Sequence, residues 1–182
     1  MNSTTAGQAQ HGHSQAGWRC ETGSVTVAAK WRRMSARVDE VSAAVDSGSI
    51  DECPDAVAGA LDALYDLWEA WRSARTGVGV TVKVVDDDRA VSGEPDGETV
   101  AALVFARGGK THAMVEFGDL TDTFSDTFRD LFGVWRWQPY TDPNPRYSTR
   151  CAWYAQHVAG QEVLPPFMRA LAWLKAQPEV AP

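Results

Sequence analysis

The sequence is poor in cysteine. Its three cysteines, Cys20, Cys53 and Cys151, are odd in number, far apart in the chain and never arranged as a C-x-x-C pair. Neither a disulfide framework nor a zinc site is expected from such spacing, and isolated thiols are typical of a reducing compartment. We therefore predict a cytoplasmic protein that needs no structural metal.

Long apolar stretches are also missing. No segment approaches the ~18 consecutive apolar residues that a transmembrane helix requires. Residues 1–17 have neither the basic part nor the apolar part of a secretory signal peptide. The sequence therefore predicts no association with a membrane.

Motifs that carry chemistry are absent too. The chain has no G-x-x-x-x-G-K-[ST] phosphate loop, no G-x-S-x-G nucleophile motif and no H-E-x-x-H zinc motif. Asp86, Asp87 and Asp88 are consecutive, whereas a calcium loop needs carboxylates at alternate positions. We accordingly predict no cofactor, no catalytic residue and no metal site, and an enzyme is less expected than a non-enzymatic protein.

Residues with A/T-rich codons are scarce. Isoleucine occurs once, at Ile50, asparagine only at Asn2 and Asn144, and lysine is rare beside arginine. This usage is typical of a GC-rich genome, so we expect a high-GC bacterium or one of its phages as the source.

The chain is rich in aromatic residues and carries net negative charge. Eight Trp, six Phe and four Tyr in 182 residues supply ample apolar area for the core of one domain. The formal net charge of −7 disfavours broad binding to nucleic-acid phosphates. Residues 1–23 have little to bury and are predicted to be a disordered leader, followed by a single domain over 24–178.

Two amphipathic segments at 25–46 and 55–75 predict a helical hairpin over residues 24–76. Apolar residues recur in each at alternating spacings of four and three, which is the pattern of a heptad seam. The seam residues are Val27, Trp31, Met34, Val38, Val41 and Val45 in the first segment, and Val57, Leu61, Leu64, Trp68 and Trp71 in the second. A short connection favours antiparallel packing of the two helices.

This hairpin resembles the small helical hairpins secreted by the type VII systems of high-GC bacteria. Tyr65 and Glu69 match their Y-x-x-x-[DE] signal, and the match covers residues 25–75 only. The W-x-G turn of those proteins is replaced by Ser47-Gly48-Ser49, and the Tyr–Glu pair lies in mid-helix rather than in a tail. These departures weigh against membership of that family.

The rest of the chain predicts an α+β fold. Four segments at 78–86, 99–106, 111–117 and 134–138 are rich in β-branched or aromatic residues and indicate a central antiparallel sheet of three to four strands. The near-continuous apolar run at 99–106 favours a central strand covered on both faces. An acidic loop from Asp86 to Gly97 and a Gly108-Gly109 turn would connect the strands. A helix at 119–132 completes the unit at 78–138, and two C-terminal helices follow within 147–177, so that three further helices pack on the sheet.

Two regions combine arginine with aromatic side chains and are candidate interaction surfaces. An antiparallel hairpin would gather the first set at one tip, and the second set lies around a Pro-rich loop. Arginine on aromatic faces is typical of protein interfaces and of base-stacking surfaces. The first set is Arg32, Arg33, Arg37, Trp71, Arg72 and Arg75, and the second is Trp135, Arg136, Trp137, Tyr140, Arg146, Tyr147 and Arg150.

Three functions remain open at this point. The first is a non-enzymatic protein–protein interaction protein, such as an adaptor, inhibitor, chaperone or assembly subunit, with a protein partner or self-association through the N-terminal helices. The second is a nucleic-acid-associated protein that uses the basic and aromatic patches. The third is a small enzyme or ligand binder with a pocket between the sheet and the C-terminal helices.

Overall fold

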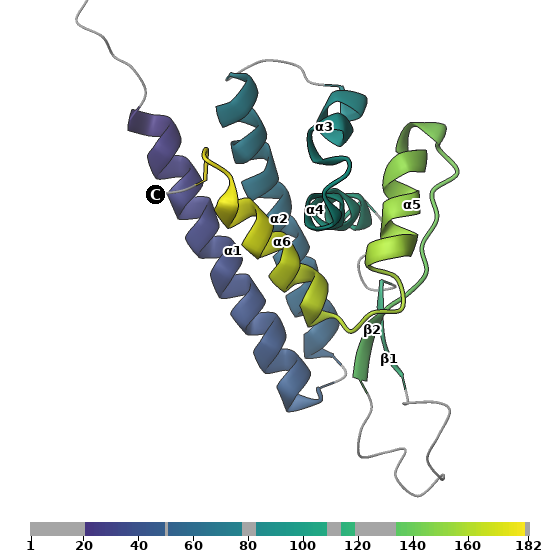
Figure 1. The fold of residues 1–182 in the computed structure, drawn as a ribbon. Coiled ribbons are helices and arrows are strands. Elements are labelled where there is room, and N and C mark those ends of the chain that lie inside the picture. The colour runs from purple at the N-terminus through teal and green to yellow at the C-terminus, as the bar shows by residue number, and fades with distance from the viewer. Residues whose placement is uncertain (1–20, 50, 78–82, 109–113, 119–133, 181–182) are drawn as a thin grey trace, which may run out of the picture.

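The described part of the chain is mostly helical (Figure 1). The computed structural model describes residues 21–49, 51–77, 83–108, 114–118 and 134–180. The predicted α+β fold with a central sheet of three to four strands is wrong, because these ranges contain a single sheet of only two strands. No helix within them is long and apolar enough to cross a membrane.

The predicted helical hairpin is present. Helices α1 (Glu21–Ser47) and α2 (Glu52–Thr76) pack side by side (Figure 1). They run antiparallel, since Arg33 in α1 pairs with Asp66 in α2 while Arg37 lies against Gly59. The heptad pattern correctly predicted the contact between the two helices, and its buried members are Val27, Met34, Val38, Val41, Val57, Leu61, Leu64, Trp68 and Trp71.

Helix α4 (Pro95–Ala106) occupies the segment predicted as the central strand. Every residue from 99 to 106 is buried within this helix, which lies between α2 and α5 in Figure 1. A continuous apolar run does not distinguish a strand covered on both faces from a helix surrounded by other helices, because neither leaves a polar stripe. Helix-start signals were nevertheless present, with Pro95 in the first turn together with Asp96 and Glu98.

Helix α3 (Val84–Val91) replaces the last third of the strand predicted at 78–86, and residues 78–82 lie outside the described ranges. Val84 and Val85 favour a strand locally. Asp86 and Asp87, however, lie in the first turn, where negative charge is favourable beside the unpaired amide groups of a helix. The loop predicted from Asp86 to Gly97 is therefore wrong over most of its length.

The sheet is one antiparallel pair. Strand β1 (Val115–Gly118) lies beside β2 (Val134–Trp137), with Val115 opposite Trp137. A strand is confirmed at 134–137 of the predicted 134–138. The described part of the strand predicted at 111–117 belongs to β1, which pairs with β2 rather than with 99–106. Residues 160–163 follow the other edge of β2, where the Val163 amide donates to the Trp135 carbonyl at 3.0 Å. Gly109 of the predicted turn and the predicted helix at 119–132 lie outside the described residues.

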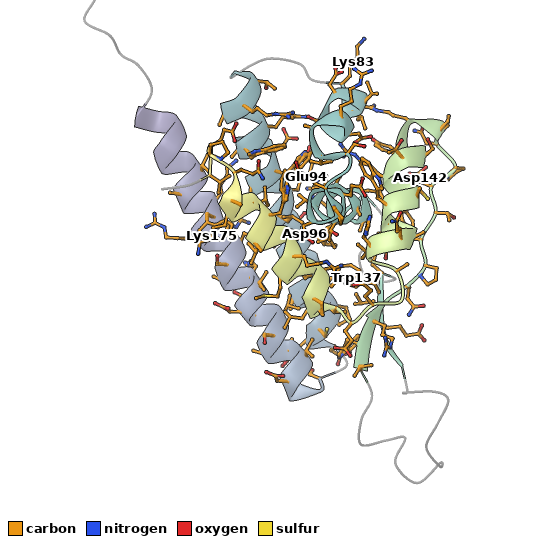
Figure 2. All side chains as sticks on the ribbon, in the orientation of Figure 1. Lys83, Glu94, Asp96, Trp137, Asp142 and Lys175 are labelled. Carbon is orange, nitrogen blue, oxygen red and sulfur yellow. The ribbon has the colours of Figure 1, made fainter. Side chains whose placement is uncertain are left out.

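The two C-terminal helices are present as predicted. Helix α5 (Ser148–His157) follows a short 3-10 turn, η3 (Pro145–Tyr147), and α6 (Leu164–Ala176) crosses in front of the α1–α2 hairpin in Figure 1. Trp173 of α6 packs on Trp71 with ring centroids 5.4 Å apart. Its indole N–H donates to Glu94, labelled in Figure 2, at 2.6 Å. Of the predicted disordered leader, residues 1–20 lie outside the described ranges, and 21–23 belong to α1.

Candidate functional site

The predicted basic tip of the hairpin does not form a free cationic surface. Arg33 pairs with Asp66 at 2.9 Å, and Arg37 pairs with Glu40 at 2.5 Å. Arg75 lies over the ring of Trp71, which is itself buried. Arg32 is exposed on α1. The arginines of this set therefore belong mostly to separate local pairs, and Arg72 lines the cavity described below.

The predicted aromatic surface at 135–150 is mainly part of the core. Trp135 and Trp137 are buried, and the Trp137 indole donates to the Val163 carbonyl at 3.1 Å. Arg136 donates to the Gly160 carbonyl at 3.0 Å. Tyr140 packs on the ring of Phe105, with centroids 5.2 Å apart. These side chains fix β2 and the loop after it, so they offer no open stacking surface.

Four predicted residues from both sets meet around one cavity of about 390 Å³. Its wall comes from α2, the start of α3, the end of α4 and the segment from Asp142 to α5, and Asp142 is labelled beside α5 in Figure 2. The predicted residues in this wall are Arg72, Arg146, Tyr147 and Arg150. The other lining residues are Tyr65, Trp68, Glu69, Val84, Asp87, Val104, Phe105, Arg107, Gly108 and Asp142.

Arg150 is a buried cation at the centre of this wall. Its side chain is only 6 % exposed, and its Nε donates to Asp88 Oδ1 at 2.6 Å. Its Nη2 is buried without a hydrogen bond in the described part of the molecule, although Asp87 Oδ2 lies 3.9 Å away. Trp68 lies beneath the guanidinium, 5.8 Å from its ring centroid. A buried cation with one uncommitted donor is costly unless a further acceptor satisfies it.

Asp87 is the matching buried acid. Arg72 bridges it to Glu69, with Arg72 Nη1 at 3.5 Å from Asp87 Oδ2. The other carboxylate oxygen, Oδ1, is buried without a hydrogen bond among the described residues. Burial raises the pKa of Asp87, and this effect outweighs the lowering by Arg72 and Arg150. A perturbed carboxyl group in a cleft is a common property of functional sites.

Two further arginines complete the wall and lie on aromatic rings. The Arg107 guanidinium is 4.2 Å from the ring centroid of Tyr65, and its Nε contacts Asp62 at 2.6 Å. Arg146 lies 5.6 Å from the ring centroid of Tyr147. No carboxylate of the described chain comes within ion-pair distance of Arg146. Arg146 is exposed, and its charge is unpaired among the described residues.

Comparison with known proteins does not assign this chain to a family. No family model matches it, and neither a curated protein nor a solved structure is significantly similar.

The cavity wall has few groups suited to covalent chemistry or metal binding. Its lining residues include no Ser, Thr, Cys, His or Lys. Across the described ranges, no cluster of three or more His, Cys, Asp or Glu side chains could hold a metal ion. What the wall does contain is four guanidinium groups, three carboxylates and four aromatic rings. This set suits recognition of an anion by hydrogen bonds and stacking.

The lining residues that sequence reasoning missed have weak local signals. Tyr65, Trp68, Glu69 and Arg72 follow the i, i+3, i+4, i+7 spacing of one helix face. That spacing could have identified a polar and aromatic stripe next to the apolar seam. Arg107 offers no comparable signal, because it joins the site only through the position of α4.

Proposed function

We propose that this protein is a non-enzymatic binding protein whose arginine-lined cavity receives the anionic group of a ligand. The observation that carries the proposal is the convergence of Arg72, Arg107, Arg146 and Arg150, from three separate parts of the chain, on one cavity of about 390 Å³. Small-molecule sites in proteins commonly enclose about 300–1,000 Å³ and contain a few converging polar groups. The chain carries a formal net charge of −7, whereas the lining of this cavity contains more arginines than carboxylates.

The four guanidinium groups of the lining outnumber its three carboxylates, which favours an anion over a cation. Arg146 has no carboxylate partner in the described part of the chain, and Arg150 retains a buried Nη2 without a hydrogen bond. Among the lining carboxylates, Glu69 pairs with Arg72, whereas Asp87 and Asp142 each keep one oxygen without a hydrogen bond among the described residues. A carboxylate or phosphate would satisfy the remaining N–H donors with charge-assisted, bidentate hydrogen bonds.

A protein partner bound through an apolar face has less support. The large hydrophobic side chains that are exposed among the described residues are Val85 and Met168, on different helices. Isolated exposed side chains of this kind do not form the apolar patch that typically marks an interface. Nucleic-acid binding also has less support, because Arg33 and Arg37 are engaged by acidic side chains and the formal net charge is −7.

The pocket expected for a ligand binder is displaced from its predicted position. The cavity lies between α2, α3, α4 and the segment at 142–150, rather than between the sheet and the C-terminal helices.

Cys53 and Cys151 are both free thiols, which supports the proposed cytoplasmic location, since reduced cysteines persist in a reducing compartment.

Calorimetric titration of the full chain with sodium pyrophosphate at constant ionic strength tests this proposal. We expect saturable binding with one site per chain. Arg146→Gln should weaken it by about tenfold or more, because a hydrogen bond to a charged group contributes about 1.5–3 kcal/mol. Arg32→Gln is the matched control, since Arg32 is exposed on α1 and does not line the cavity.

Two results would overturn the proposal. One is the absence of saturable binding to the wild-type chain. The other is an equal loss of binding in Arg32→Gln and Arg146→Gln, which would indicate general attraction to positive charge. Circular dichroism of each variant establishes that the helices are retained before binding is compared.

A further inference from the structure

One part of the cavity lining can hold a planar group. The Arg107 guanidinium carbon lies 4.2 Å from the ring centroid of Tyr65, and the contact of its Nε with Asp62 at 2.6 Å fixes the direction of the guanidinium. Both Arg107 and Tyr65 line the cavity. Guanidinium planes and tyrosine rings are surfaces on which bases and other aromatic rings stack. A preorganised stack of this kind adds little conformational cost when a third planar group joins it.

A second part of the cavity lining can hold the charge. Arg146 has no carboxylate partner among the described residues, and its guanidinium is steadied by the ring of Tyr147 at 5.6 Å. Arg150, one turn further along, is 6 % exposed and keeps a buried Nη2 without a hydrogen bond. Both arginines line the cavity, so an anion there can accept hydrogen bonds from their guanidinium groups. A phosphate monoester, with three terminal oxygens and about two charges near neutral pH, matches this donor set better than a single carboxylate does.

Asp142, which also lines the cavity, supplies an acceptor. One of its carboxylate oxygens accepts the Asn144 amide at 2.8 Å, and no described residue donates a hydrogen bond to the other. Carboxylate side chains accept hydrogen bonds from exocyclic amino groups of bases. The lining thus offers a stacking surface, an anion-binding wall and an acceptor for an amine within about 390 Å³.

On the strength of the proposed anion-binding function, we infer that the ligand is a small aromatic phosphate monoester of mononucleotide size. Its ring stacks against the Arg107–Tyr65 pair, and its phosphate accepts hydrogen bonds from Arg146 and Arg150. The aromatic part and the phosphate each contribute to affinity, so a compound that has only one of them binds more weakly.

Calorimetric titration of the full chain with four compounds tests this inference. The compounds are adenosine 5′-monophosphate, ribose 5-phosphate, adenosine and inorganic phosphate, at one ionic strength. We expect adenosine 5′-monophosphate to bind about tenfold or more tightly than each of the others, a ratio that stacking of one base commonly supplies. The comparison within the wild-type chain keeps the test valid even if a variant fails to fold.

Two variants locate the effect. Tyr65→Leu should weaken adenosine 5′-monophosphate several-fold and leave ribose 5-phosphate unchanged, because only the stacking surface is altered. Arg146→Gln should weaken both phosphates together. Tyr140→Leu is a matched control, since Tyr140 is also partly buried but does not line the cavity.

The outcomes separate the two proposals. If ribose 5-phosphate binds as tightly as adenosine 5′-monophosphate and depends on Arg146, the anion site stands and the aromatic ligand class is overturned. Equal binding of adenosine and adenosine 5′-monophosphate overturns the phosphate part. If pyrophosphate and all four compounds fail to bind, the anion-binding function and the ligand class fail together.

Discussion

Removal of the buried cation Arg150 should destabilise the protein far more than removal of an exposed arginine. In Arg150→Met the side chain keeps similar length but loses its charge. Asp88 then loses a hydrogen bond of 2.6 Å, and Asp87 loses a cation at 3.9 Å. The variant therefore leaves two buried carboxylates with fewer partners in the same place.

The expected magnitude follows from burial. The side chains of Arg150, Asp87 and Asp88 are 6 %, 3 % and 10 % exposed. Breaking a pair of this kind by removing one partner costs about 3–5 kcal/mol, because the remaining charge stays away from water. Arg33→Met is the matched control. Arg33 and Asp66 are 56 % and 41 % exposed at a distance of 2.9 Å, and an exposed pair contributes only ~0–1 kcal/mol.

Urea unfolding followed by tryptophan fluorescence measures both free energies of unfolding, without ligand at pH 7. Lowering the pH to 5 should reduce the loss in Arg150→Met, because burial raises the pKa of Asp87 and its protonation removes uncompensated charge. Losses of equal size in Arg33→Met and Arg150→Met would refute the reasoning from burial. A loss below about 1 kcal/mol in Arg150→Met would also refute it, since water would then reach the carboxylates readily.

Three other predictions concern packing and titration. Gly97→Ala should destabilise the protein by about 1–3 kcal/mol, since a Cβ there would meet the Trp173 ring at 3.0 Å. Gly59→Ala, in mid-helix with its nearest contact at 3.7 Å, should stabilise the protein by about 0.5–1 kcal/mol. Thermal unfolding that shows a change of the same sign for both variants would contradict the packing. Burial raises the pKa of Asp87 in the folded state, so the folded chain binds its proton more readily than the unfolded chain. The stability of the wild type relative to Asp87→Asn should therefore rise as the pH falls from 7 towards 4, and a fall would mean that the arginines dominate. Cys53 is buried and its pKa is raised to about 11, so alkylation at pH 8, followed by peptide mass spectrometry, should modify it only at the rate of unfolding; rapid modification of folded protein would show that the thiol is accessible.

The helices that the sequence predicted correctly are those with a one-sided apolar pattern. The seam through Met34, Val38 and Val41 leaves polar residues on the opposite face, so that periodicity alone identifies both the helix and its buried side. The segment at 99–106 has no such contrast, and the sequence alone did not distinguish α4 from a covered strand. Its true state depends on burial by the neighbouring α3 and by α2, α5 and α6, which come from more distant parts of the chain.

The sequence predicted which types of residue form the candidate site, but it did not predict which residues come together there. Arg72, Arg146, Tyr147 and Arg150 stood out as arginines and aromatic residues, but they were placed in two separate surfaces. Their convergence requires the packing of α2 against the end of α4 and the segment before α5. Trp135 and Trp137 belong to the same predicted set of arginine and aromatic residues, but they are buried in the core and do not line the cavity.

By itself, the sequence determined the helical hairpin, the C-terminal helices, the strand at 134–138 and the scarcity of catalytic motifs, since each rests on local periodicity or on composition. Only the tertiary structure decided that residues 95–106 are a buried helix and that arginines from three regions enclose one cavity. The physical reason is that burial on all sides and the pairing of charges depend on contacts between distant residues, which leave no periodic trace in the chain.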